Sequence, residues 1–364
     1  MNVSFLDLRR ATASDRDLLD AAFEEVADSG RFVLGEAVEE FEAAFAEYCG
    51  VGYAVGLASG TSAITIALQA NGVGAGDEVL TAANSCVPTV VGIEASGATA
   101  VLVDPDPVSH MLDPAQLRGA LSPRTRAVVP VHLYGQCADM GAVCAFAREH
   151  GLAVVEDAAQ AHGAEIAGPR AGAFGAAAAY SFYPTKNLGA LGDAGALVTS
   201  DPAVAERARL LRNYGERARY DSVLRGGNSR LDELQARILL ARLPNLEARN
   251  ARRREVAAVY LEGLSGLGLG LPVEMPGNRH VYHLFVVTAA DRDGLRARLS
   301  ASGVGTMVHY PRPIHQHDAY RDLDRPGQLT VSERLAGQVV SLPLHPDLTD
   351  EEVRFVVSAV AASL

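Results

Sequence analysis

Residues 152–160 read LAVVEDAAQ. In this stretch a short apolar run, residues 152–155, is followed by two acidic residues, Glu156 and Asp157. Similar apolar runs lie at residues 53–57, 78–81, 100–103 and 127–131, and helix-length sequence separates each run from the next. Continuous apolar runs of this length are typical of strands buried on both faces of a parallel sheet. We therefore predict an α/β protein with a mainly parallel central sheet flanked by helices.

Two later apolar runs, at residues 177–182 and 196–199, are separated only by a loop. Parallel strands are usually joined through a crossover helix, and no helical pattern lies in this loop. We therefore expect this part of the sheet to be antiparallel or irregular.

The character of the chain changes at an arginine-rich helical pattern over residues 244–254. Beyond it the alternation is looser, with strand-like runs at 281–287 and 305–308. Helical patterns across the chain lie at residues 61–70, 202–212, 230–242, 292–300 and 350–361. The sequence thus predicts a larger domain over residues 1–245 and a smaller C-terminal α+β domain over residues 246–364.

Composition argues against several classes of protein. Of the 364 residues, 48% are hydrophobic, so the chain can bury a large core and we do not expect disorder. No apolar run approaches the roughly 18 to 20 residues that span a bilayer, and the start becomes charged too early for a signal peptide. We expect a cytoplasmic protein without membrane contact. The net charge of -12 argues against nucleic-acid binding, and four cysteines without a CxxC pair indicate no metal site.

Lysine use is unusual in this chain. Lysine and arginine together number 32, yet Lys186 is the only lysine, so the other 31 are arginines. A guanidinium stays charged, whereas a desolvated amine can lose its proton and attack a carbonyl. The single lysine therefore indicates a chemical role, with chance survival on the surface as the alternative.

Three segments could supply the parts of one site. Residues 59–62 (SGTS) separate a predicted strand from a helix, where backbone N–H groups could bind a phosphate or Ser59 could simply cap the helix. Asp157 follows a strand end, where α/β sheets bind ligands, or it caps the next helix. Lys186 lies in a glycine-flanked loop after another apolar run. A phosphate nest, an acid and an amine are the groups that pyridoxal 5'-phosphate requires for its phosphate, ring nitrogen and aldehyde.

Longer motifs follow in a fixed order along the chain. They are SGT (59–61), VHLYGQ (131–136), EDAAQAHGA (156–164), SFYPTKNLGALGDAGALVT (181–199), GGNSRLDELQA (226–236) and GVGTMVHYPRPIH (303–315). In these motifs the chain resembles the DegT/DnrJ sugar aminotransferases, a family of fold type I pyridoxal-phosphate enzymes. The resemblance extends from about Leu6 to the last predicted helix, and it implies a homodimer whose subunits share their active sites.

The resemblance implies a role for each matching residue around the cofactor. Lys186 would bind the aldehyde, Asp157 would pair with the pyridine nitrogen, and Gln160 would hydrogen-bond the side of the ring that carries the hydroxyl. The residues that would hold the phosphate are Gly60, Thr61, Ser181 and, across the dimer interface, Asn228.

Further residues would border the substrate. By the same resemblance they are His162 (close to the cofactor), Tyr183, His309, Tyr310 and His315. Arg230 could bind the carboxylate of the amino donor, or it could form an ion pair between subunits. The histidines that we expect to be structural or on the surface are His132, His150, His280, His283 and His317.

One position departs from many relatives. Cys86 stands in the segment NSCVPT (84–89), where those relatives carry an aromatic residue that stacks on the pyridine face. A thiol cannot stack in that way. We expect Cys86 to pack on the ring as a small apolar group and to leave the substrate side roomier.

The resemblance implies transamination, because a branch of the family that carries His in place of Lys186 performs dehydration. The motifs are most similar to enzymes that aminate C3 of a dTDP-3-keto-6-deoxyhexose, with L-glutamate as donor, in deoxysugar and antibiotic biosynthesis. Amination at C4 of a nucleotide-linked ketosugar, or of an inosose, is the alternative. A regulator that binds pyridoxal phosphate without turnover is a more distant one.

Overall fold

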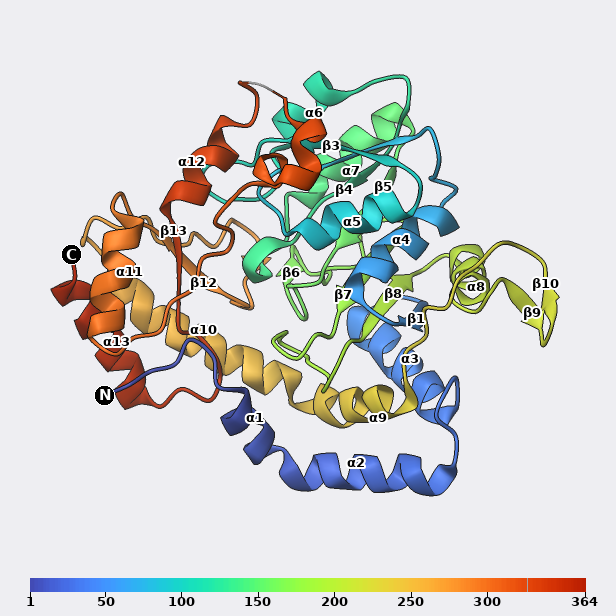
Figure 1. The fold of residues 1–364 in the computed structure, drawn as a ribbon, viewed down its shortest axis with the longest axis horizontal. Helices are drawn as coiled ribbons and strands as arrows, with labels where there is room; N and C mark the ends of the chain where they lie inside the picture. Colours follow the sequence, from blue (N-terminus) through green and yellow to red (C-terminus); the bar gives the residue numbers. More distant parts are fainter. Residues whose placement is uncertain (326) are drawn as a thin grey trace.

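The computed structural model describes residues 1–325 and 327–364, and a seven-stranded sheet forms its centre (Figure 1). In spatial order the strands are β1 (Tyr53–Leu57), β8 (Gly195–Thr199), β7 (Ala177–Ser181), β5 (Ala153–Asp157), β4 (Thr125–Val129), β2 (Glu78–Ala82) and β3 (Thr99–Val103). All of them run parallel except β8, which is antiparallel to both of its neighbours. The predicted α/β fold with a mainly parallel sheet is confirmed, and so is the antiparallel part after residue 177.

Both faces of the sheet are covered, which explains why its strands are apolar throughout. Ala177 and Ala179 of β7 join an apolar cluster with the helices on one face, whereas Ala178 and Tyr180 join a cluster on the other face. Successive side chains of a strand point to opposite faces, so each of these residues is buried. The helices in these clusters are α4 (Gly60–Ala70), α5 (Val87–Ala95) and α8 (Pro202–Leu211) on the first face, and α3 (Glu36–Cys49) and α9 (Glu233–Arg242) on the second.

Two further helices precede α3 at the start of the chain. They are α1 (Leu8–Ser14) and α2 (Arg16–Ser29), and α2 lies along α9 (Figure 1). Leu19 and Ala22 of α2 pack against Ile238 of α9. The N-terminal helices therefore enclose the second face of the sheet from outside.

The C-terminal part is built around the long helix α10 (Leu246–Gly263) and a two-stranded antiparallel sheet. Its strands are β12 (Phe285–Thr288) and β13 (Val339–Leu342), and its helices are α11 (Arg292–Ala301), α12 (Thr330–Gln338) and α13 (Asp350–Ala362). Val3 from the N-terminus packs in the same apolar cluster and pairs with Val304. The division at residue 245 stays a prediction.

Two strand predictions for this part are wrong in their extent. The run 281–287 forms a strand only from Phe285, because Tyr282 has a φ of 43°, which an extended strand does not allow. The run 305–308 forms no strand: Gly305 donates its N–H to Val3, and the next backbone pairing is between Met307 and Ser341. A segment that changes partner after two residues cannot build a ladder with either.

Short elements complete the described structure. They are α6 (Pro114–Ala120), α7 (Met140–His150), β6 (Glu165–Ile166), β9 (Glu216–Ala218), β10 (Asp221–Ser222), β11 (Asn278–Arg279) and the 3-10 segments η1 (Leu133–Gly135), η2 (Leu243–Asn245), η3 (Ile314–Gln316) and η4 (Asp318–Leu323). In the described part of the chain no helix combines the length and the apolar character needed to cross a membrane.

Candidate active site

The predicted site residues gather at one edge of the central sheet. Asp157 is the last residue of β5, Ser181 is the last residue of β7, and Ser59 follows the end of β1. Because these three strands are parallel, their carboxyl ends meet at the same edge, where open α/β sheets bind ligands.

Helix α4 begins at this edge with a glycine. Ser59 is its N-cap and forms a capping box with Ser62, so the capping role considered for Ser59 is real. The N–H groups of Gly60 and Thr61 have no hydrogen-bond partner among the described residues. Two free donors at the positive end of a helix dipole suit an anion such as a phosphate.

Close packing of backbone holds this helix start in place. A Cβ on Gly60 would lie 2.7 Å from the Cβ of Ser181, so only glycine lets α4 approach the end of β7. Gly195 of β8 pairs with Leu57 on one side and with Ser181 on the other. Gly195 was not predicted as a site residue. Its signal in the sequence is a glycine directly before the apolar run 196–199, because glycine in a strand often marks a close approach of backbone.

Asp157 is buried, with 5% of its surface exposed, and protein donors hold both of its carboxylate oxygens. Thr89 Oγ1 donates to Oδ2 at 2.7 Å, and the backbone N–H of Ala159 donates to Oδ1 at 3.1 Å. No helix follows Asp157, so the alternative role as a helix cap is wrong. The carboxylate instead closes a turn and stays available at the strand end.

Lys186 lies in the loop after β7, where its backbone N–H donates to Tyr183 O at 2.8 Å. Burial lowers the pKa of Lys186, and the nearby Asp157 and Cys86 oppose that shift. A lower pKa leaves more of the amine neutral near pH 7, which is the form that attacks a carbonyl.

Three histidines lie near Lys186, and all of them are held neutral. Burial, followed by the charge of Lys186, lowers the pKa of His162 to about 3, that of His309 to about 4, and that of His283 well below its usual range. His283, which was expected to be structural or on the surface, is buried, and its Nδ1 lies 3.1 Å from Asn187 Oδ1, next to the lysine. Neutral imidazoles add no fixed positive charge beside the amine.

Gln160 links two loops above the sheet edge. Its Oε1 accepts the backbone N–H of Tyr134 at 2.6 Å, and its Nε2 donates to the Tyr310 hydroxyl at 3.0 Å. The Tyr134 hydroxyl in turn donates to the backbone carbonyl of His309. These bonds bring the C-terminal segment around residue 310 to this edge of the sheet.

Cys86 precedes α5 and faces the same region. The side chains that act on the charge of its thiol include those of Tyr310, Lys186 and Asp157. Burial raises the pKa of Cys86. The thiol is therefore protonated near pH 7, and the packing of Cys86 on the cofactor ring stays a prediction.

The other predicted residues have different surroundings. The two rings nearest His162 are those of Tyr180 and Phe182, with centroids 5.2 and 5.6 Å from its own. His315 is buried with its Nε2 3.1 Å from Glu333 Oε1, and Tyr183 is 52% exposed.

Asn228 and Arg230 lie on the segment that precedes α9. Asn228 is exposed, and its backbone pairs with that of Asn213. Arg230 donates to the Asn213 side chain at 3.0 Å and lies over the ring of Tyr214. Asn228 therefore lies at the surface of the single chain, whereas Arg230 is half-buried.

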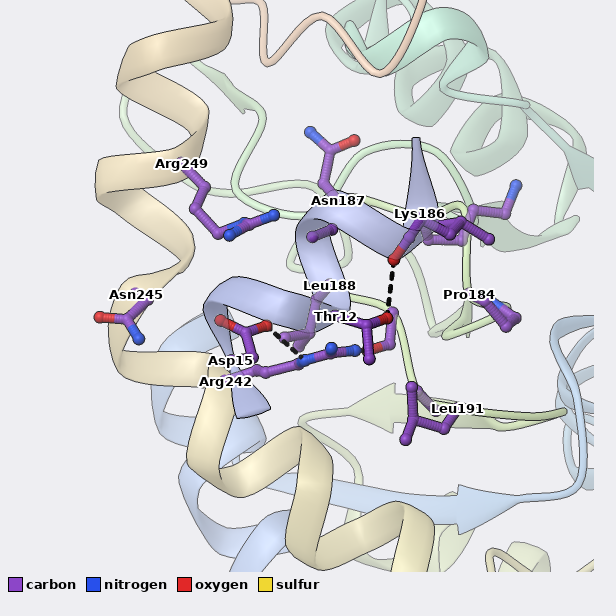
Figure 2. A pocket seen from close by; sticks show the side chains of 14 residues that line it. Thr12, Asp15, Pro184, Lys186, Asn187, Leu188, Leu191, Arg242, Asn245 and Arg249 are labelled. Atoms are coloured by element: carbon purple, nitrogen blue, oxygen red, sulfur yellow. Dashed lines mark hydrogen bonds and ion pairs between the residues drawn. The ribbon is translucent and has the colours of Figure 1, made fainter. Parts of the chain in front are cut away.

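A separate cavity of about 200 Å³ lies behind the lysine loop (Figure 2). Its polar wall is the ion pair between Arg242 and Asp15, 3.0 Å apart, and the Lys186 side chain turns away from this pair. The cavity therefore lies behind the backbone of Lys186, on the side away from its amine.

The donor set at the sheet edge fits pyridoxal phosphate. Lys186 offers an amine, Asp157 a buried carboxylate, and Gly60 and Thr61 offer two free N–H groups. Across residues 1–325 and 327–364 no three His, Cys, Asp or Glu side chains lie in a group that could hold a metal ion.

Two polar residues of this site were not predicted. Thr89 bonds Asp157, and Tyr134 bonds Gln160. Tyr134 has a φ of 61°, and such a backbone state leaves no mark in the sequence. Thr89 stands in the segment NSCVPT, but nothing local indicates a partner 68 residues away.

Comparison with known proteins agrees with this geometry. The family model described as the DegT/DnrJ/EryC1/StrS aminotransferase family matches residues 14–361. A dTDP-3-amino-3,4,6-trideoxy-alpha-D-glucose transaminase from Streptomyces venezuelae is 49% identical over 98% of this chain and 95% of its own. The erythromycin biosynthesis sensory transduction protein EryC1 from Saccharopolyspora erythraea is 48% identical over 100% of both chains. The crystal structure of NtdA from Bacillus subtilis with the bound cofactor PMP has a TM-score of 0.94 and 32% identity, covering 100% of this chain and 85% of that one.

Proposed function

The chain belongs to the DegT/DnrJ/EryC1/StrS aminotransferase family, and we propose that it transfers an amino group from L-glutamate to C3 of a dTDP-linked 3-keto-6-deoxyhexose. One observation carries the proposal: the only lysine of the chain and the buried carboxylate of Asp157 lie at the same sheet edge as the free N–H groups of α4. The S. venezuelae relative is a transaminase named for a dTDP-linked 3-amino sugar, which supports a dTDP-sugar as the substrate and C3 as the carbon that is aminated.

Five groups of this chain would hold the cofactor. The N–H groups of Gly60 and Thr61 would bind the phosphate together with the Ser181 hydroxyl. Asp157 would pair with the ring nitrogen, and Lys186 would bind the aldehyde. When bound, pyridoxal phosphate supplies a carbonyl that takes up the amino group and a cationic ring that accepts electrons from the donor.

Lys186 has two tasks in this account. Its neutral amine would hold the cofactor by its aldehyde. Once that amine is free, Nζ would take the proton from Cα of glutamate and, as general acid, deliver it to the carbon that carried the aldehyde. In the second half reaction Nζ acts in the reverse direction on the sugar carbon. The lowered pKa of Lys186 suits both tasks, because an amine that gains and loses a proton near neutral pH is an efficient acid and base.

Substrate selection falls to residues of the C-terminal segment. His309 and Tyr310 reach the sheet edge through Tyr134 and Gln160, so a sugar placed above Lys186 would meet them first. Cys86 leaves room on the same side. His162, Tyr183, Arg230 and His315 stay proposed substrate-side residues.

The proposed assembly is a homodimer in which the partner subunit's Asn228 completes each phosphate site. Its exposed position in a single chain supports this. An exposed amide at a loop can reach a neighbouring subunit at little conformational cost.

The test is a transamination assay with the purified protein, pyridoxal phosphate, L-glutamate and a dTDP-3-keto-6-deoxyhexose. We expect 2-oxoglutarate and a dTDP-3-amino sugar in equal amounts, with parallel double-reciprocal lines because the two half reactions are separate. Amination of a dTDP-4-keto sugar or of an inosose, with the 3-keto sugar unused, would contradict the proposed substrate.

A regulatory function is the second candidate, because the relative EryC1 is named a sensory transduction protein. A protein of that kind would bind pyridoxal phosphate but release no 2-oxoglutarate with any ketosugar. The same assay therefore separates the two functions.

A further inference from the structure

A row of three hydrogen-bonded side chains ends at Asp157. Ser85 Oγ lies 2.8 Å from Thr89 Oγ1, and Thr89 Oγ1 lies 2.7 Å from Asp157 Oδ2. All three residues are buried, with exposed fractions of 3%, 1% and 5% in that order. Water therefore does not compete for these bonds.

The donors of this row can run in one direction only. An ionised carboxylate has no proton to give, so the Thr89 hydroxyl donates to Asp157. A hydroxyl has a single proton, so Thr89 can only accept from Ser85. Ser85 thus orients the Thr89 hydroxyl, and Thr89 orients the carboxylate.

The helix that carries Thr89 is fixed against the helix that starts at Gly60. A Cβ on Gly92 of α5 would lie 2.8 Å from the backbone oxygen of Thr61, and Thr65 Oγ1 donates to Gly92 O at 2.9 Å. Because α4 and α5 pack without space between them, the distance from the start of α4 to the Thr89 hydroxyl is set by backbone contact.

Asp157 keeps room for one more donor. Thr89 occupies Oδ2 and the Ala159 N–H occupies Oδ1, and each carboxylate oxygen accepts about two hydrogen bonds. The two protein donors hold the carboxylate plane at fixed rotation and leave an acceptor position free.

We propose that Thr89 and Ser85 are positioning residues that hold the free acceptor of Asp157 toward the ring nitrogen of the cofactor. The inference deepens the proposed function and rests on it. Neither hydroxyl needs to touch the cofactor, since each acts through the next residue in the row.

Equilibrium titration of the apoprotein with pyridoxal phosphate, followed by absorbance, measures the effect directly. Thr89→Val removes the donor at nearly constant volume, and we expect about tenfold weaker cofactor binding. Thr89→Ser keeps the hydroxyl and should bind within about twofold of the unchanged protein. Ser85→Ala loses only the orienting bond, so its loss should lie between these two values.

Thr81→Val is the matched control. Thr81 is a fully buried threonine on β2 whose hydroxyl donates to Val129 O at 2.9 Å, away from Asp157. Thermal unfolding should show both valine variants losing similar stability, since each loses one buried hydrogen bond. Only Thr89→Val should weaken cofactor binding.

Three results would overturn the inference: tight cofactor binding by Thr89→Val, an equal loss in Thr89→Ser, or an equal loss in Thr81→Val. If the unchanged protein binds no pyridoxal phosphate, the proposed function fails as well. That result is distinct, because the titration of the unchanged protein is done first.

Discussion

Gly195 lies directly against Ser59, and a Cβ on Gly195 would lie 2.2 Å from the carbonyl carbon of Ser59. Gly195 also pairs with the last residues of β1 and β7. The absent side chain therefore lets the N-terminus of α4 lie over the strand ends, next to Ser181.

Replacing this glycine should disrupt the proposed phosphate site. Gly195→Ala forces α4 or β8 to move, so we expect about 1 to 3 kcal/mol of lost stability and at least about tenfold weaker binding of pyridoxal phosphate. Gly192→Ala in the same loop is the control, because its Cβ would meet only the end of the Gln235 side chain, at 3.4 Å. Titration and thermal unfolding of both variants measure the effect, and equal cofactor affinity in the two would contradict it.

The rate at which Lys186 captures the cofactor should depend on pH. Burial lowers the pKa of Lys186, so raising the pH should produce neutral amine, and covalent capture of the cofactor should reach its plateau below the ordinary lysine pKa of about 10.4. Stopped-flow absorbance of the apoprotein with pyridoxal phosphate measures this rate against pH.

Lys186→Arg is the control for that profile. The guanidinium keeps the positive charge and cannot lose it, so this variant should show no covalent capture at any pH. A profile that rises only at the pH of a free lysine would show that burial does not activate the amine.

Cys86 should separate cofactor binding from sugar binding. Cys86→Phe fills the space beside Tyr310 with a ring, so we expect cofactor binding to persist and KM for the sugar to rise about tenfold. Cys86→Ala, which adds no volume, should leave KM within about twofold. Unchanged kinetics in Cys86→Phe would remove Cys86 from the substrate side.

Mixed dimers test whether the active sites are shared. Lys186→Ala and Asn228→Ala each impair the pure homodimer, but a mixed dimer has one site with both residues intact if Asn228 acts across the interface. Random mixing should then restore about a quarter of the unchanged specific activity. No recovery on mixing would place Asn228 in the same subunit as the lysine that it serves.

The sequence predicted the parts of this protein that leave a local pattern. Continuous apolar runs gave the parallel strands, because strands buried on both faces cannot afford polar positions. The helix α3 also leaves a local pattern, because Val38, Phe41 and Phe45 recur at helical spacing on one face, but this helix was not predicted. Lys186 was found because it is the only lysine, and Asp157 because it lies at the end of a strand.

Contacts between distant segments could not be read in the same way. Thr89 and Asp157 are 68 residues apart in the chain, and they meet only because the folded chain brings the start of α5 to the end of β5. The strand predicted at 305–308 failed for a related reason, since its backbone pairs with Val3 and then with Ser341. Such pairings depend on the completed fold.

A visible spectrum most directly tests whether Lys186 binds pyridoxal phosphate and L-glutamate donates the amino group. It is recorded on the purified protein with pyridoxal phosphate, before and after addition of L-glutamate. We expect an absorption band of lysine-bound cofactor, which Lys186→Arg lacks. Glutamate should convert this band to the spectrum of the pyridoxamine form. A band that forms normally but does not change with glutamate would contradict L-glutamate as the amino donor, and no band at all would contradict the role of Lys186.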